Sequence, residues 1–199
     1  MKASDFNLSK EINFSFERGE VTFKNNRFII LDANAIGLLR YKLIEQLGME
    51  QARALFLKSG YVNGYSDFMQ FKTCYKFYNE IELLSAGPIM HTWQGIVKAE
   101  PKKLDFDRAK GEFYFSGVWT NPYEAEQHLI YCDPSVDPVC WSLMGYSAGY
   151  ASAFFGSKLI SIEPVCVGKG DDHCEWEIQP PEAWDYEIAK PYIEALKEF

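Results

Sequence analysis

Residues 138–176 read PVCWSLMGYSAGYASAFFGSKLISIEPVCVGKGDDHCEW, and this stretch decides the fold. Its first part belongs to a segment, 137–155, with the apolar spacing of a helix, and Gly156 is typical of a helix end. Two segments of strand character follow, KLISIEPVCVG and HCEWEIQ, joined by the tight turn Gly168–Asp172. The stretch therefore predicts a helix that leads into an antiparallel hairpin.

The same stretch predicts a metal site. Glu163 and Cys166 are separated by two residues, and the turn can bring Cys166 close to Cys174. Two ligands close in sequence and a third across a hairpin resemble zinc-ribbon geometry. Cys140 lies at the start of the helix, where the N-terminus favours a thiolate, and it is a candidate fourth ligand.

Cys132 and His173 are alternative fourth ligands. The thiols could instead be small buried hydrophobic groups beside a surface glutamate. If zinc is bound, four protein ligands leave no position for water, so we expect a structural and not a catalytic ion. The five cysteines are an odd number, and the charged N-terminus has no apolar signal core. We therefore expect a cytoplasmic protein without a disulfide framework.

Composition narrows the class of protein. The chain has 199 residues, of which 47% are apolar and 24% charged, which is typical of one globular domain with a sizeable core. The net charge is −8 and no basic run occurs, so we expect neither nucleic-acid binding nor attachment to an anionic membrane. The apolar runs are too short to span a bilayer. Phosphate-binding and hydrolase motifs are absent, which disfavours an enzyme.

The rest of the chain reads as α+β with an antiparallel sheet and packed helices. Residues 12–30 predict a hairpin, and Asp32 is a candidate N-cap for a helix that ends at Gly48. A second helix is expected over 50–59, with breaks at Gly60 and Gly64.

Further helical sequence spans 65–86, and Gly87-Pro88 is expected to end it. From residue 89 the period changes to that of strands, with a turn at Arg108–Gly111. A short helix is expected over 122–131, and a final helix over 182–199 with an interruption at Pro191.

Aromatic residues suggest a cavity. Alternate residues of a strand share a face, which places Phe113, Phe115, Gly117 and Trp119 together. Gly117 leaves room between large neighbours for something flat. Such stripes usually belong to a closed core, which is the alternative interpretation.

Polar groups favour the cavity over a closed core. His91 and Trp93 are expected to share a face of the preceding strand, and Tyr146 and Tyr150 to share a face of the long helix. His91 and Trp119 carry N–H groups on mostly apolar walls, which suits an apolar ring with one polar substituent.

The chain resembles a known family through several motifs. They are GLLRYKLIEQLG (37–48), KSGYVNGY (58–65), GPIMHTWQG (87–95), FYFSGVWTNPYEAEQHL (113–129), PVCWSLMGYSAGYASAFFG (138–156) and EPVCVGKGDDHCEW (163–176). Together they resemble the aromatic-effector sensor domain of NtrC-family transcriptional activators, which contains a 4-vinyl-reductase-type domain. The resemblance covers about residues 12–185.

The resemblance implies a structural zinc ion held by three cysteines and a glutamate, which fall on Cys140, Glu163, Cys166 and Cys174. It implies a small, phenol-like aromatic effector in a closed cavity. The effector hydroxyl would be held by a histidine and a tryptophan, which fall on His91 and Trp119.

The resemblance also implies a homodimer whose sensor restrains a downstream AAA+ ATPase domain. Residues 1–30 would help dimerisation, residues 31–185 would form the sensing domain, and residues 186–199 would begin the linker helix. Trp93 stands where the family pattern has a smaller aliphatic residue, and Gly117 where it has a larger one. A different pocket shape is therefore expected. The alternatives are a reductase of tetrapyrrole vinyl groups and a dimeric interaction scaffold.

Overall fold

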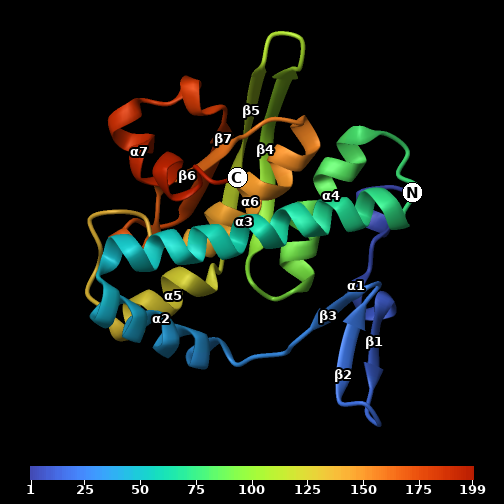
Figure 1. The fold of residues 1–199 in the computed structure, drawn as a ribbon, viewed down its shortest axis with the longest axis horizontal. Coiled ribbons are helices and arrows are strands. Elements are labelled where there is room, and N and C mark those ends of the chain that lie inside the picture. The colour runs from blue at the N-terminus through green and yellow to red at the C-terminus, as the bar shows by residue number, and fades with distance from the viewer.

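The computed structural model describes residues 1–199, which fold as α+β with two antiparallel sheets (Figure 1). The larger sheet has the strand order β4-β5-β7-β6, and the smaller is a meander of β1-β2-β3. The strands are β1 Ile12–Ser15, β2 Glu20–Phe23, β3 Asn26–Phe28, β4 Lys98–Asp107, β5 Glu112–Thr120, β6 Ile160–Val165 and β7 Cys174–Gln179. The expected α+β class and the N-terminal hairpin are confirmed.

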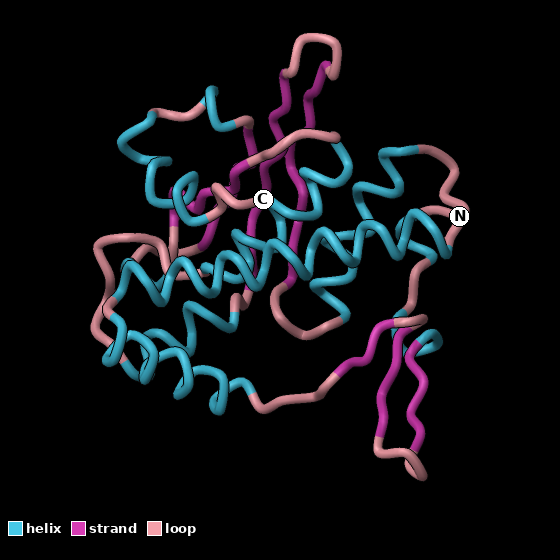
Figure 2. The backbone as a smooth tube through the Cα atoms, in the orientation of Figure 1, coloured by secondary structure: helices cyan, strands magenta, loops and turns pink.

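Seven α-helices accompany the sheets (Figure 2). They are α1 Leu8–Glu11, α2 Ala33–Leu47, α3 Met49–Cys74, α4 Glu80–Trp93, α5 Tyr123–Tyr131, α6 Trp141–Phe155 and α7 Tyr186–Ala195. In both views the N-terminal meander lies to one side of the body, and an extended segment connects it to α2. No helix is both long and apolar enough for a membrane span.

The expected break at Gly60 and Gly64 is wrong, because α3 runs through both as a single helix of 26 residues. A Cβ at either glycine would overlap the backbone of α6, and a Cβ at Gly145 or Gly149 would overlap the backbone of α3. The four glycines therefore let the two helices cross at close range (Figure 1). The prediction that small residues of the long helix permit close packing is confirmed.

The expected helix end at Gly87-Pro88 is also wrong. Both residues lie inside α4, which continues to Trp93, and the next strand begins only at Lys98. Gly87 serves packing, since a Cβ there would lie 2.9 Å from Cδ1 of Tyr150. The strand expected from residue 89 is therefore the last turn of a helix.

Helix ends elsewhere follow the sequence. Asp32 caps α2 by accepting hydrogen bonds from the backbone N–H groups of Asn34 and Ala35, as predicted. Gly156 ends α6 in the left-handed conformation, with φ +92°. The interruption expected at Pro191 does not occur, because this residue lies within α7.

The face of β5 is as expected. Phe113, Phe115, Gly117 and Trp119 are buried, while the residues between them are partly exposed. β5 pairs with β4 on one side and with β7 on the other. A continuous apolar face of the sheet is thus available to the helices above it, and two sites lie there.

Candidate functional site

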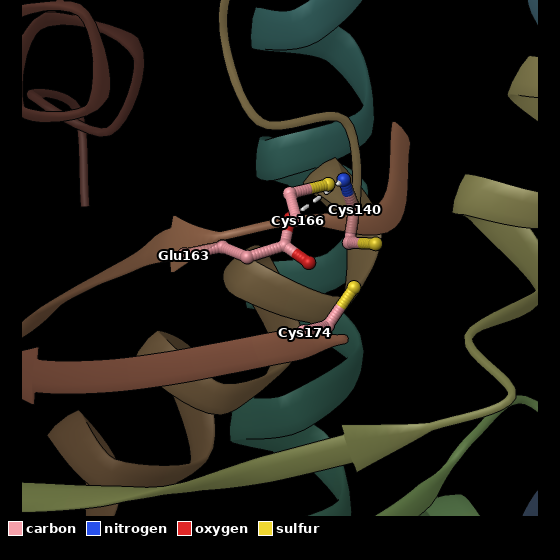
Figure 3. A group of neighbouring side chains, drawn as sticks. All are labelled: Cys140, Glu163, Cys166 and Cys174. Carbon is pink, nitrogen blue, oxygen red and sulfur yellow. Dashed lines mark hydrogen bonds between the residues drawn. The ribbon is translucent and has the colours of Figure 1, made fainter. Parts of the chain in front are cut away.

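Four buried side chains form a cluster at the start of α6 (Figure 3). Cys140 directly precedes α6, Glu163 lies on β6, Cys166 follows β6 and Cys174 begins β7. One ligand atom from each lies within 4.8 Å of all the others. The four sequence-predicted ligands are therefore brought together, from three segments of the chain.

The turn between β6 and β7 shapes this cluster. Residues Val167–Lys169 form a single 3₁₀ turn, which reverses the chain. The backbone N–H of Cys166 donates to Oδ2 of Asp171 over 2.8 Å, and that of Val167 donates to Sγ of Cys174 over 3.2 Å. These bonds hold the two cysteines of the hairpin on its inner side.

The electrostatics of the cluster favour a bound cation. Glu163 is fully buried; its Oε2 accepts the N–H of Cys140 over 3.2 Å, and its Oε1 has no partner. Burial raises the pKa of both Glu163 and the Cys140 thiol. A metal ion would engage the unpartnered oxygen and compensate the negative charge of deprotonated ligands.

The alternative fourth ligands lie outside the cluster. Cys132 is half-buried at the end of α5. His173 is exposed and hydrogen-bonds through its ring to Glu175, over 2.9 Å, and to Asp172. The structure thus selects Cys140 from the three candidates.

A buried carboxylate also fixes the start of α6. Oε2 of Glu124 accepts the backbone N–H groups of Ser142, over 2.8 Å, and Leu143, over 3.1 Å. These are N–H groups of the first turn, which have no acceptor within the helix. The start of α6 is therefore held both by the cluster and by α5.

The second site is a cavity between the sheet and helices α4 and α6. Its volume is about 30 Å³. It is lined by Leu84, Gly87, Pro88, His91, Ala99, Phe115, Trp119, Tyr146, Ser147, Tyr150, Ala151, Trp176 and Ile178. Apolar and aromatic side chains dominate the lining, and no charged carboxylate, lysine or arginine belongs to it.

His91 and Trp119 supply unpaired polar groups to the lining. The His91 ring stacks on Tyr146, with 3.6 Å between the ring centroids, and forms no hydrogen bond within the protein. Burial lowers the pKa of His91 to about 3, so the ring is neutral at physiological pH. Trp119 is buried, and its N–H makes no hydrogen bond within the protein. A polar ligand group would find both a donor and an acceptor here.

The two tyrosines of the lining are anchored. Tyr146 donates its hydroxyl hydrogen to Oδ2 of Asp67 over 3.0 Å, and Tyr150 donates to the carbonyl of Leu83 over 2.7 Å. Asp67 lies on α3 and is buried, and this burial raises its pKa to about 6. Helix α3 therefore helps to set the position of the cavity wall.

Two of the expected site residues do not line the cavity. Trp93 is 41% exposed, and its Nε1 donates to the carbonyl of Phe6 over 3.1 Å. Residues 91 and 93 belong to a helix, which turns about 200° over two residues, so the two side chains diverge. Gly117 lies behind the lining, where it makes room for the ring of Trp176.

Sequence reasoning missed two residues of this site. Trp176 lines the cavity between Cys174 and Ile178 on the buried face of β7, and strand alternation from Cys174 would have found it. Asp67 lies near the middle of a helix, and no local pattern marks it. Its role depends on a tyrosine 79 residues away.

Comparisons with known proteins agree with this arrangement. A family model described as "Activator of aromatic catabolism" matches residues 7–107, and a model of the 4-vinyl-reductase-type domain matches residues 119–180. The two matches meet near the cavity, since His91 falls in the first and Trp119 in the second.

The chain is similar to two curated regulators. It is 34% identical over 178 residues to the phenol regulator MopR of Acinetobacter guillouiae, and 29% identical over 177 residues to the transcriptional regulatory protein XylR of Pseudomonas putida. Each match covers 89% of this chain but 32% and 31% of the relatives, so the chain spans about a third of their length.

A solved structure is also similar. It is the phenol-responsive sensory domain of the transcription activator PoxR, determined with phenol. The TM-score is 0.86 at 32% identity, with 94% of this chain and 92% of the other covered. The fold and the order of the elements are therefore shared along nearly the whole chain.

Proposed function

The chain belongs to the XylR_N family of activators of aromatic catabolism, and we propose that it is a sensor domain that binds a small aromatic effector in its cavity. One observation carries this proposal. The lining is aromatic, and it includes an unpaired imidazole and an unpaired indole N–H that no other group of the protein satisfies. Apolar walls with a few polar groups are typical of small-molecule sites.

A phenol fits these polar groups in one arrangement. The ring lies against Tyr146 and Tyr150, whose own hydroxyl groups are already engaged. The phenol hydroxyl accepts a hydrogen bond from Trp119 and donates one to the unprotonated nitrogen of His91. A neutral imidazole is required for this, and the lowered pKa of His91 supports it. Each such bond contributes about 1 kcal/mol.

Calorimetry tests the assignment with two ligands that differ by one hydroxyl. We expect His91→Ala to weaken phenol binding about tenfold and toluene binding much less, because only phenol uses the imidazole. His173→Ala is the matched control, since His173 is exposed and lies outside the cavity. Equal weakening of both ligands by His91→Ala would remove His91 from the proposed role.

The cluster of three cysteines and Glu163 is proposed to hold a structural zinc ion. Thiolates with one carboxylate make a four-ligand set that zinc accepts in tetrahedral geometry, without a position for water. Elemental analysis of protein purified without chelator is expected to find one zinc per chain. A folded sample with well under one metal ion per chain would contradict the site.

Further proposals concern the longer protein. The relatives are about three times as long, and we propose that this domain controls an AAA+ ATPase domain in the same chain. We also propose a cytoplasmic homodimer, in which residues 1–30 assist dimerisation, residues 31–185 sense the effector and residues 186–199 begin the linker. The named relatives are regulators, which favours ligand binding over turnover as the function.

A further inference from the structure

The cavity has walls of two kinds. Tyr146 and Tyr150 are held by hydrogen bonds to Asp67 and to the carbonyl of Leu83. Trp176 is 2% exposed, and its Nε1 is sealed from solvent without any partner. An unpaired buried N–H is unfavourable, so no hydrogen bond holds this indole in its present position.

Trp176 owes its place to Gly117. The two residues are directly paired across β5 and β7. A Cβ on Gly117 would lie 2.5 Å from Cζ2 and 2.8 Å from Cε2 of the indole, so the ring occupies the space that a side chain on β5 would take. Phe115 contacts it edge-on at 4.8 Å, and Trp119 stacks on it at 6.1 Å between ring centroids. The indole thus forms one wall of the cavity with aromatic contacts alone.

The cavity is smaller than an aromatic ring requires. Its volume is about 30 Å³, whereas a cavity of ~150 Å³ is known to bind benzene. A ring can enter only if part of the wall moves. Movement of either tyrosine breaks a hydrogen bond, while movement of Trp176 breaks none and lets its N–H find a partner.

We propose that Trp176 is the residue that determines the size of ring accepted by the cavity, as a wall that is displaced when the effector binds. This inference rests on the proposed function and adds to it the class of ligand. The domain takes single six-membered rings, and the indole excludes fused two-ring compounds.

Calorimetry with phenol and 2-naphthol tests this inference on the full chain. We expect the wild-type protein to bind phenol at least tenfold more tightly than 2-naphthol. Trp176→Leu is expected to reduce this preference at least tenfold, because the smaller side chain leaves room for the second ring. Trp93→Leu is the matched control, since Trp93 lies outside the cavity, and it is expected to keep the wild-type preference.

Trp176→Phe serves as a second variant if Trp176→Leu does not fold, and it is expected to reduce the preference about threefold. An unchanged preference in a folded Trp176 variant overturns the inference, as does an equal change in Trp93→Leu. A wild-type protein that binds phenol and 2-naphthol equally well also overturns it. Absence of binding by either ligand contradicts the proposed function itself, so the two failures are distinguishable.

Discussion

The two sites lie along the same helix and differ in how they treat buried polar groups. At the start of α6, four ligand atoms converge to within 4.8 Å, from segments that are otherwise separate. Along the middle of α6, the imidazole and indole N–H groups around the cavity stay unpaired. The first arrangement suits a fixed anchor, and the second leaves binding capacity for a ligand from outside.

Removal of one ligand from the anchor is expected to have the largest effect. Cys166→Ser should destabilise the fold by about 3–5 kcal/mol or more, because the remaining buried ligands lose their shared cation. Chemical denaturation and elemental analysis would measure stability and metal content together. Cys74→Ser is the control, because Cys74 is exposed and outside the cluster. A Cys166→Ser protein as stable as its parent would show that the cluster does not anchor α6.

A second change breaks the contact that carries the cavity wall. Gly149→Ala places a Cβ against the backbone of Tyr61, which cannot yield, and about 3 kcal/mol of stability should be lost. Gly37→Ala is the control, since its Cβ would meet only the flexible side chain of Gln127. Urea denaturation of both variants measures the difference. Equal losses would mean that the close crossing of α3 and α6 has no special weight.

The pH dependence of stability tests the buried acid behind the wall. The pKa of Asp67 is about 6 in the folded protein against 3.8 for an ordinary aspartate, through burial, with Tyr146 and Gln94 donating to the carboxylate. Its contribution to stability is therefore full below pH ~4 and is lost as the pH rises through about 6, by about 2–3 kcal/mol in total.

Asp67→Asn keeps an acceptor for Tyr146 and removes this titration. Between pH 4 and pH 7, the wild-type protein should lose about 2–3 kcal/mol relative to the variant in urea denaturation. The lowered pKa of His91 gives the opposite slope, but it is present in both proteins and cancels in the difference. Parallel pH profiles would show that Asp67 does not titrate in this range.

The smallest expected effect concerns a single hydrogen bond of the anchored wall. Tyr150→Phe removes the bond to the carbonyl of Leu83 and should cost about 1 kcal/mol. Thermal or urea denaturation would detect it. Tyr78→Phe, at an exposed tyrosine, should cost nothing measurable. An equal effect at both positions would mean that the Tyr150 wall is not held by this bond.

The anchor could be predicted from the sequence more fully than the cavity. Glu163, Cys166 and Cys174 lie within twelve residues, and a tight turn brings them together, so spacing alone indicates their chemistry. Strand alternation likewise gave the buried face of β5. These are local relations, which a pattern of short period records.

The errors concern relations between distant segments. Gly60 and Gly64 look like helix breakers, yet their lack of a side chain serves contact with α6, about 80 residues later. His91 was expected on a strand because Gly87-Pro88 is typical of a helix end, whereas packing against Tyr150 keeps the helix intact. Asp67 carries no local signal at all, since its partner belongs to another helix.

The central claim is that the cavity binds a neutral aromatic ring through His91 and Trp119. A crystal structure of the chain with 4-bromophenol tests it most directly, because anomalous scattering locates the bromine atom without ambiguity. We predict one bromine in the cavity of each chain, with the phenol oxygen within hydrogen-bond distance of both side chains and Trp176 displaced. Bromine sites confined to the surface, with the cavity unchanged, would contradict the account.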